Sequence, residues 1–515
     1  MTLVCGGRMF RAIHFSQKGF KMQPWKLAGS AAILALTTGT AALADVTPEE
    51  VWQSWQDFFA TSGSTITTGS AARDGDSLVI TDFKAAFDGA EGKGETAIAE
   101  IRLRDKGDGT VEMTLSEEAS FSSSSPGSEG GKPRGATGTM KMPGLVGTVS
   151  GSAEDMAYAF DFPSVEIALE PSEDGKPVGT FGVLLSGSTS SYHLTGPAEA
   201  KVFDGSFTAA SAAMNLEGKD EATTFMGSVN VADLSGSTKG TFAGVEHEDI
   251  AVALGKGFAL DSSLSFGALS YDFDITDDTG PAKLTGGSEG GSFQMAMDAA
   301  KMLLAAAGKN VEVTFSGAQL PFPEVKLTYA ESGFNLTMPL SKSDEAQEFS
   351  FLTKIVDLQV SEEIWGMFDP TAALPHDPAT VVIDTAGKAR LKADLMATPE
   401  GGQPDGELLA LDVKDLTARI AGAELTGNGA FTFDNTDLAT YDGLPAPTGT
   451  LDLKMTGGNT LLDKLVAMGL VSEDEVMGIR MMVAMFAKAG EGEDVLTSTL
   501  EFKDKHFFAN GQQLQ

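Results

Sequence analysis

The feature that most constrains the fold is an alternation of apolar and polar residues that recurs along most of the chain. Tyr271, Phe273 and Ile275 alternate with polar residues, and the segments 165–170 and 451–456 repeat the pattern. A period of two places every second side chain on the same side of a β-strand, so that one face is apolar and the other polar. Antiparallel sheets that are wetted on one side have this pattern. The alternation therefore predicts a mainly β protein.

Turn residues separate the alternating segments and set the scale of the sheet. The chain contains 60 glycines among 515 residues, and many of them follow Asp, Asn or Ser in pairs that favour tight turns. The pairs on which the prediction relies are Asp74-Gly75, Asp108-Gly109, Asp174-Gly175, Ser332-Gly333 and Asn428-Gly429. They imply roughly twenty strands, more than one small sandwich needs. We predict a large, twisted, mostly antiparallel β-sheet covered by a few amphipathic helices.

Four segments carry helical signals. Thr47-Pro48-Glu49-Glu50 is a capping box with proline at the first helical position, and it predicts a helix over 48–60. Further helices are expected over about 292–307, 361–368 and 459–488, the last as a helical hairpin broken at Gly469. Because three of the four lie late in the chain, we divide it into an N-terminal β-rich region, 45–290, and a C-terminal β-rich region with helices, 291–515.

The first 44 residues have the composition of a secretory signal. Lys18, Lys21 and Lys26 precede an apolar run that closes on Ala42-Leu43-Ala44, which predicts cleavage between Ala44 and Asp45. Met22 is a plausible true start, because the signal is complete from that residue. The signal predicts a periplasmic protein. Cys5, the single cysteine, lies in the leader, so the mature chain would have no disulfide and no cysteine-linked lipid anchor.

Charge excludes one class of partner. The chain holds 36 basic and 72 acidic side chains, a formal charge of −36. Removing residues 1–44, which carry five basic and no acidic side chains, changes this charge to −41. Such a field repels nucleic acid. No later segment has about 18 consecutive apolar residues, so no transmembrane span is predicted after cleavage.

Catalytic motifs are weak. Gly286-Gly-Ser288-Glu-Gly290 matches the Gly-x-Ser-x-Gly turn of serine hydrolases, but that turn requires a parallel α/β sheet, which the alternation does not predict. His376 lies beside Asp377 and could form a base–carboxylate pair, although an ordinary loop histidine is the simpler interpretation. No spacing typical of a metal site is present and no cofactor is predicted.

A methionine-rich face is the best candidate for ligand binding. Met477, Met481 and Met485 recur at helical spacing, with Met482 and Phe486 beside them. Core packing against the sheet explains such a face most simply. Methionine is also pliable and polarizable, and it lines grooves that accept varied apolar ligands. Met477, Met481, Met485 and Phe486 are therefore the predicted ligand-binding residues.

The segment from Glu363 to Thr380, EIWGMFDPTAALPHDPAT, contains three prolines that stiffen the connection from helix to strand. It closely resembles the signature of the bacterial family known as domain of unknown function 2125. The segments 427–435, 461–469, 492–494 and 509–512 are similar to that family as well. The resemblance implies a secreted envelope protein of Gram-negative bacteria, without catalytic residues to carry over. The β-rich body also looks loosely like AsmA-type envelope proteins, which are associated with lipid handling.

These observations favour a non-enzymatic protein of the envelope with a structural or interaction role. A lipid or other hydrophobic ligand on the concave face of the sheet, or an envelope protein, is the expected partner. The alternative is a periplasmic hydrolase that uses Ser288 or unrecognised carboxylates.

Overall fold

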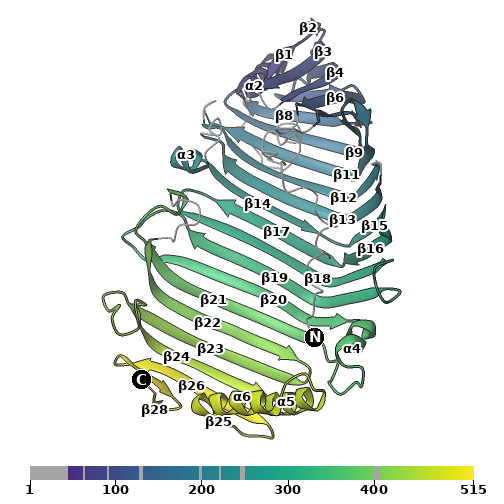
Figure 1. The fold of residues 1–515 in the computed structure, drawn as a ribbon. Helices are drawn as coiled ribbons and strands as arrows, with labels where there is room; N and C mark the ends of the chain where they lie inside the picture. Colours follow the sequence, from purple (N-terminus) through teal and green to yellow (C-terminus); the bar gives the residue numbers. More distant parts are fainter. Residues whose placement is uncertain are drawn as a thin grey trace.

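A computed structural model shows one continuous antiparallel sheet that curves into a long trough (Figure 1). The structure describes residues 45–61, 64–89, 92–126, 132–196, 200–219, 222–243, 250–397 and 405–514. The predicted signal, residues 1–44, lies outside the described residues. The predicted fold class, a large and mostly antiparallel β-sheet with a few helices, is confirmed.

The strands of the N-terminal half are β1 (Thr65–Thr67), β2 (Ser70–Asp74), β3 (Ser77–Gly89), β4 (Gly92–Asp105), β5 (Val111–Leu115), β6 (Glu118–Ser125), β7 (Arg134–Lys141), β8 (Val146–Ser152), β9 (Asp155–Glu173), β10 (Lys176–Pro177), β11 (Gly179–Thr195), β12 (Val202–Lys219), β13 (Thr224–Thr241), β14 (Ala259–Phe266), β15 (Leu269–Asp277) and β16 (Gly280–Ser288). Those of the C-terminal half are β17 (Gly290–Met297), β18 (Lys301–Gly317), β19 (Val325–Pro339), β20 (Gln347–Val360), β21 (Ala379–Leu391), β22 (Gly406–Ile420), β23 (Ala423–Asp434), β24 (Ala446–Thr456), β25 (Lys488–Ala489), β26 (Val495–Lys503), β27 (His506–Ala509) and β28 (Gln512–Gln513).

Most strands pair with the strands next to them in sequence. From β18 to β24 each strand pairs with the next, and β11, β12 and β13 do the same. β14 and β15 are two halves of one bent strand, because both pair along β13. β17 and β16 likewise pair along β18. Such a meander needs only short connections.

A line of irregular residues crosses the strands at the same level and bends the sheet. Pro163, Gly187, Ala210 and Asp233 face one another across β9, β11, β12 and β13, as the registers on both sides of them show. Gly187 and Asp233 have φ angles of 56° and 52°, in the left-handed region, and Asn310 in β18 and Asp357 in β20 repeat this conformation. A single left-handed residue shifts the side-chain alternation and kinks a strand, as in a β-bulge. We call this line the crease.

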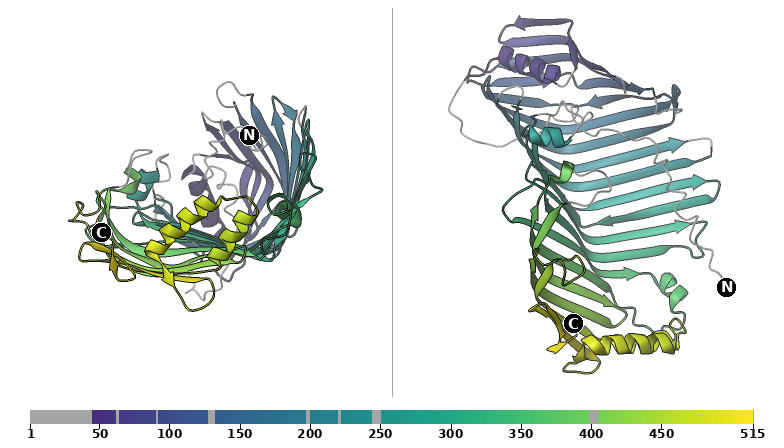
Figure 2. Two further views of the ribbon diagram at one scale, coloured as in Figure 1. Left: turned by 60° about the horizontal axis from the view of Figure 1, so that its bottom comes forward. Right: turned by 60° about the vertical axis from the view of Figure 1, so that its left-hand side comes forward.

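The crease gives the sheet two walls and a concave side. Figure 2 shows the sheet curving around the side on which α2 (Pro48–Thr61), α5 (Gly458–Ala467) and α6 (Glu473–Phe486) lie. At the N-terminal end this side is a closed core, in which Trp52 of α2 lies 6.0 Å from Phe83, between ring centroids. Glu50 and Thr47 form the predicted capping box, with Thr47 N donating to Glu50 Oε2 at 2.8 Å.

Three of the four predicted helical segments are confirmed. The prediction 48–60 corresponds to α2, and 361–368 corresponds to α4 (Glu362–Phe368). The hairpin 459–488 is the pair α5 and α6, with Gly469 in the turn at φ 71°. Ser472 and Glu475 form a capping box at the start of α6.

The predicted helix 292–307 is wrong. Its residues form most of β17, a turn and the first part of β18, and β14 and β19 pair on the two sides. Asp298 organises the turn by accepting hydrogen bonds from the amides of Ala300 and Lys301, at 2.7 and 2.9 Å. Two complete strand ladders outweigh the helix propensity of the alanines and leucines in this run.

Other local predictions also need correction. Ser332-Gly333 and Asn428-Gly429 are interior strand residues of β19 and β23, not turns. The sequence did not predict α3 (Ile250–Gly255), whose buried Ala253 and Leu254 pack with Phe258 and Leu340 at the rim of the sheet. The division at residue 290 stays a prediction; this residue begins β17, inside the single sheet.

Candidate functional site

The concave face carries a row of uncharged side chains that crosses the sheet from β9 to β26. Every neighbour in this row is a paired partner on the next strand. The row consists of Phe160, Ser190, Phe207, Gly236, Leu264, Phe293, Ala306, Phe334, Thr353, Ile383, Leu416, Gly427, Leu453 and Ser498. Paired residues lie side by side on one face, so the row is a continuous apolar surface.

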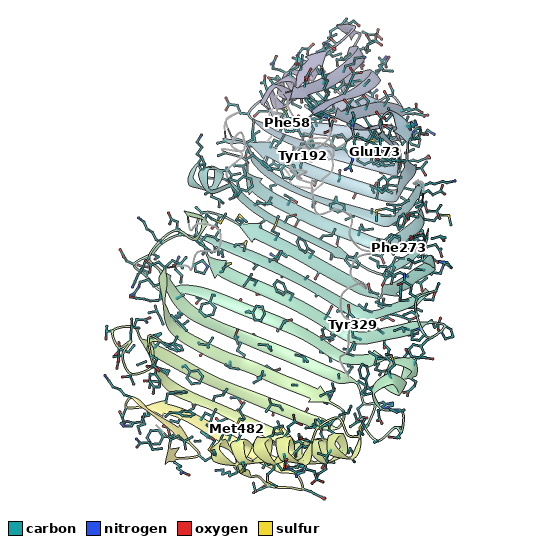
Figure 3. The ribbon with its side chains drawn as sticks, in the orientation of Figure 1. Phe58, Glu173, Tyr192, Phe273, Tyr329 and Met482 are labelled. Atoms are coloured by element: carbon teal, nitrogen blue, oxygen red, sulfur yellow. The ribbon has the colours of Figure 1, made fainter. Side chains whose placement is uncertain are left out.

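A second uncharged row lines the wall on the other side of the crease. It runs through Ile167, Val183, Met214, Val229, Tyr271, Gly286, Val313, Leu327 and Val360, from β9 to β20. We call the space between the two rows the trough. Figure 3 labels Phe273 of β15 and Tyr329 of β19 on this wall.

The convex face has the opposite chemistry. The residues that alternate with the first row include Asp161, Thr189, Thr208, Ser235, Ser265, Ser292, Lys354, Thr417, Thr426, Lys454 and Thr497. Hydroxyl pairs bridge strands here, such as Ser235 with Ser265 at 2.7 Å between oxygens. The sheet therefore keeps its polar face in water.

Among the described residues, no helix or strand covers the trough between the N-terminal core and α6. Large side chains on its walls keep substantial exposure: Phe293 is 43% exposed, Phe315 40%, Ile355 40% and Val381 48%. In a sandwich a second layer would bury such a face. Exposed apolar surfaces of this kind are typical of interaction and ligand-binding surfaces.

Close packing of rings over glycine makes part of the trough floor. A Cβ atom on Gly236 would lie 2.3 Å from the ring of its neighbour Phe207, and one on Gly227 would lie 2.4 Å from the ring of Phe273. The rings therefore lie flat over neighbouring backbone, as aromatic residues do beside strand glycines. The result is a smooth apolar floor.

The C-terminal end of the trough is closed by aromatic residues and α6. Phe502 lies 6.1 Å from Phe431 and 4.8 Å from Phe507, and Phe486 of α6 lies 6.3 Å from Phe507, between ring centroids. Ser498 and Asn510 donate hydrogen bonds to the carbonyl oxygen of Phe486, at 2.5 and 2.9 Å. These bonds fix the end of the helix to the sheet.

The structure separates the four predicted ligand-binding residues. Phe486 belongs to the aromatic end of the trough, whereas Met477, Met481 and Met485 are 61%, 64% and 59% exposed. Helical geometry places these methionines on the side of α6 opposite Val476, which is 3% exposed. Their role in ligand binding stays a prediction, and the simpler expectation of core packing is wrong for the three methionines.

Ser288 lies at the end of β16, paired with Leu269, and β17 follows at Gly290. This is the crease between two strand halves and not the strand-to-helix turn that a nucleophilic serine requires. Close backbone packing explains why glycine occupies positions 286 and 287. A Cβ atom on Gly286 would lie 2.2 Å from the carbonyl oxygen of Glu312, and a Cβ atom on Gly287 would lie 2.3 Å from the carbonyl oxygen of Leu269.

His376 contacts side chains other than the adjacent Asp377. Its ring stacks on Trp365 at 4.3 Å between centroids, and its Nδ1 lies 3.0 Å from a Glu362 oxygen. Asp369, whose side chain is fully buried, accepts hydrogen bonds from the amides of Ala373 and Leu374, at 2.9 and 2.6 Å. The proline-rich segment 369–378, which we call the strap, is thus a folded structural unit.

The described residues contain neither a cluster of metal ligands nor a membrane-spanning helix. Within these ranges no three His, Cys, Asp or Glu side chains are grouped as metal ligands. Among the described helices none has the length and apolar character to cross a membrane.

Comparison with protein families identifies most of the C-terminal half. Residues 262–508 match the family described as uncharacterized protein conserved in bacteria, DUF2125. This match confirms the predicted resemblance to the family over these residues. The match begins well before Glu363, where the first segment that resembles the family starts, and it includes both walls of the trough from β14 to β20.

Other comparisons add little. No curated protein matches the chain significantly. One solved structure, the ferric preacinetobactin receptor BauA from Acinetobacter baumannii, is similar at 9% identity, over 87% of this chain and 76% of that chain, with a TM-score of 0.15. A score this low carries no argument about the fold.

The residues that line the trough were visible in the sequence only as alternation. Phe293, Met295 and Met297 alternate with Ser292, Gln294 and Ala296, yet this segment was predicted as helix. The alternation predicts an apolar face. It does not predict whether that face is exposed, because exposure depends on how many helices pack against it.

Proposed function

We propose that this protein is a periplasmic, non-enzymatic lipid-binding protein whose trough holds the acyl chains of lipid molecules. The single observation that supports it best is the uncharged row that crosses the sheet from Phe160 to Ser498 and stays exposed in its middle. The predicted signal, residues 1–44, supports the location. The looser likeness to AsmA-type envelope proteins points the same way.

Hydrocarbon fits this surface better than a protein partner does. Protein interfaces carry about one hydrogen bond per 100–200 Å² and a polar rim. The two concave rows offer hydroxyl groups at a few positions, such as Ser190 and Thr353, and no charged or amide side chain. An acyl chain needs no hydrogen bonds, and burying it releases roughly 0.8 kcal/mol per CH₂ group.

Binding can be tested with a pair of neighbouring substitutions. Ala306 is exposed on the concave face between Phe293 and Phe334, whereas Ala305 faces the convex side between Gln294 and Asn335. Ala306→Asp places a carboxylate in the path of the chain, and we expect it to weaken binding of a fluorescent C16 fatty acid about ten-fold or more. Ala305→Asp is the matched control and should bind like the wild type.

Fluorescence titration of the purified, delipidated mature protein measures both affinities, and circular dichroism checks that both variants fold. Equal weakening by the two substitutions would indicate damage to the sheet and not a blocked trough. Absence of any binding by the wild-type protein would contradict the proposed function.

A further inference from the structure

We infer that the trough holds more than one acyl chain at a time, arranged end to end along the crease. This inference rests on the proposed function and adds the orientation and the number of the bound chains. Three features carry it: the direction of the crease, the length of the uncovered stretch, and the lack of any charged side chain along the two rows that line it.

The crease sets the orientation of a bound chain. It crosses successive strands at one level, at Gly187, Asp233, Asn310 and Asp357, so it runs across the strands along the length of the trough. The two walls meet there. A rod-like chain contacts both walls only if it lies parallel to this line, and contact with both walls buries more apolar surface than contact with one.

The length of the trough sets the number of chains. The strands that carry both walls of its open stretch follow one another in the order β12, β13, β14, β17, β18, β19 and β20. With neighbouring strands about 4.8 Å apart, they extend over roughly 29 Å. Each leaflet of a bilayer is about 15 Å of hydrocarbon, half of a core of about 30 Å, so a single acyl chain would leave about half of this stretch empty.

Nothing in the two rows divides this length into separate compartments. From Phe207 to Leu453 the first row contains no charged side chain, and the second contains none from Met214 to Val360. A charge would act as a barrier, because removing it from water without a partner is costly. The apolar path therefore continues from one chain position to the next.

Stoichiometry tests the inference. Titration of the delipidated mature protein with cis-parinaric acid, followed by native mass spectrometry, should show at least two probe molecules per chain at saturation. Single aspartates should each remove about one probe molecule and leave the others: Val229→Asp near the N-terminal end, Ala306→Asp in the middle and Val381→Asp near the C-terminal end. Ala305→Asp, on the convex face, should leave the number unchanged.

The outcomes separate this inference from the proposed function. The wild type could instead saturate at one probe molecule per chain, with only one of the three aspartate substitutions abolishing its binding. That result would overturn multiple occupancy but leave the proposed lipid binding intact. Binding to none of the proteins would contradict the proposed function itself. Saturation at two or more, reduced stepwise by the concave substitutions, supports both.

Discussion

At the scale of single residues, the most constrained carboxylate in the strap is Asp369. Burial by itself raises the pKa of this side chain, but the hydrogen bonds that it accepts from the amides of Leu374 and Ala373, together with contacts to Thr371 and His376, lower the pKa below its ordinary value. The charged form is therefore the one that the folded strap stabilises. The strap connects α4 to β21 and lies within the segment that resembles the family signature.

This pKa shift predicts how stability depends on pH. A carboxyl group whose pKa is lowered by folding stabilises the protein above its unfolded pKa of about 3.9, and the effect is lost as the pH falls through the lower folded value. Asp369→Asn should lower the free energy of unfolding at pH 6, and the difference from the wild type should shrink below about pH 4.

Urea unfolding followed by tryptophan fluorescence measures this difference at both pH values. Asp377→Asn, at the exposed neighbour of His376, is the control and should leave the free energy of unfolding nearly unchanged. A constant difference between Asp369→Asn and the wild type at pH 6 and pH 3 would contradict the assignment.

At the scale of strands and helices, the crease depends on residues that tolerate positive φ. Asn310 has φ 47°, and its side-chain amide donates a hydrogen bond to Glu289 at 2.6 Å across the same line. Asparagine and aspartate enter the left-handed region more easily than β-branched residues. Single Asp and Asn residues inside strands are therefore the sequence signal of the crease at Asp233, Asn310 and Asp357.

We expect Asn310→Val to lower the free energy of unfolding by about 1–2 kcal/mol, because valine opposes the left-handed conformation. Asn310→Gly is the matched variant: it also removes the bond to Glu289 but keeps the conformation, so it should cost less. Thermal and urea unfolding of the two proteins compare them. A larger loss for glycine than for valine would show that the side-chain bond, and not the backbone conformation, is what matters at this position.

The sequence predicts an element well where a local signal determines its conformation, and poorly where pairing with other strands determines it. The helices at Pro48 and Glu473 begin with capping boxes, a local signal, and both were predicted. Segment 292–307 lacks a cap of that kind, and pairing with β14 and β19 decides its conformation. The Gly-Gly-Ser288-Glu-Gly sequence resembles a catalytic turn because a crowded crease and a nucleophile turn both require glycine.

At the scale of the whole molecule, the trough carries large apolar side chains that the described residues leave partly exposed. Phe293 and Val381, 43% and 48% exposed, lie on a face that a bound lipid would cover. A ligand that binds only the folded state raises the free energy of unfolding, and above the dissociation constant this increase grows with the logarithm of the free ligand concentration. The lipid-loaded protein should thus be more stable than the delipidated protein.

At a free lipid concentration about 100 times the dissociation constant, this stabilisation is about 2.7 kcal/mol per independent site. Differential scanning calorimetry of the delipidated mature protein, with and without added C16 fatty acid, should show a higher Tm for the loaded form. Ala305→Asp should retain the increase and Ala306→Asp should lose most of it. An identical Tm with and without lipid in the wild type would contradict the binding model.

The pairing of strands with their sequence neighbours has a consequence for how this architecture can vary. From β19 to β23 each strand pairs with the strand before it and the strand after it in sequence. Stability in such an array is close to a sum of nearest-neighbour contributions, as in repeat proteins. Inserting or deleting a hairpin would lengthen or shorten the molecule by two strand spacings without redesigning the remainder. Proteins with this architecture can therefore differ in the length of the sheet through changes in the number of hairpins alone.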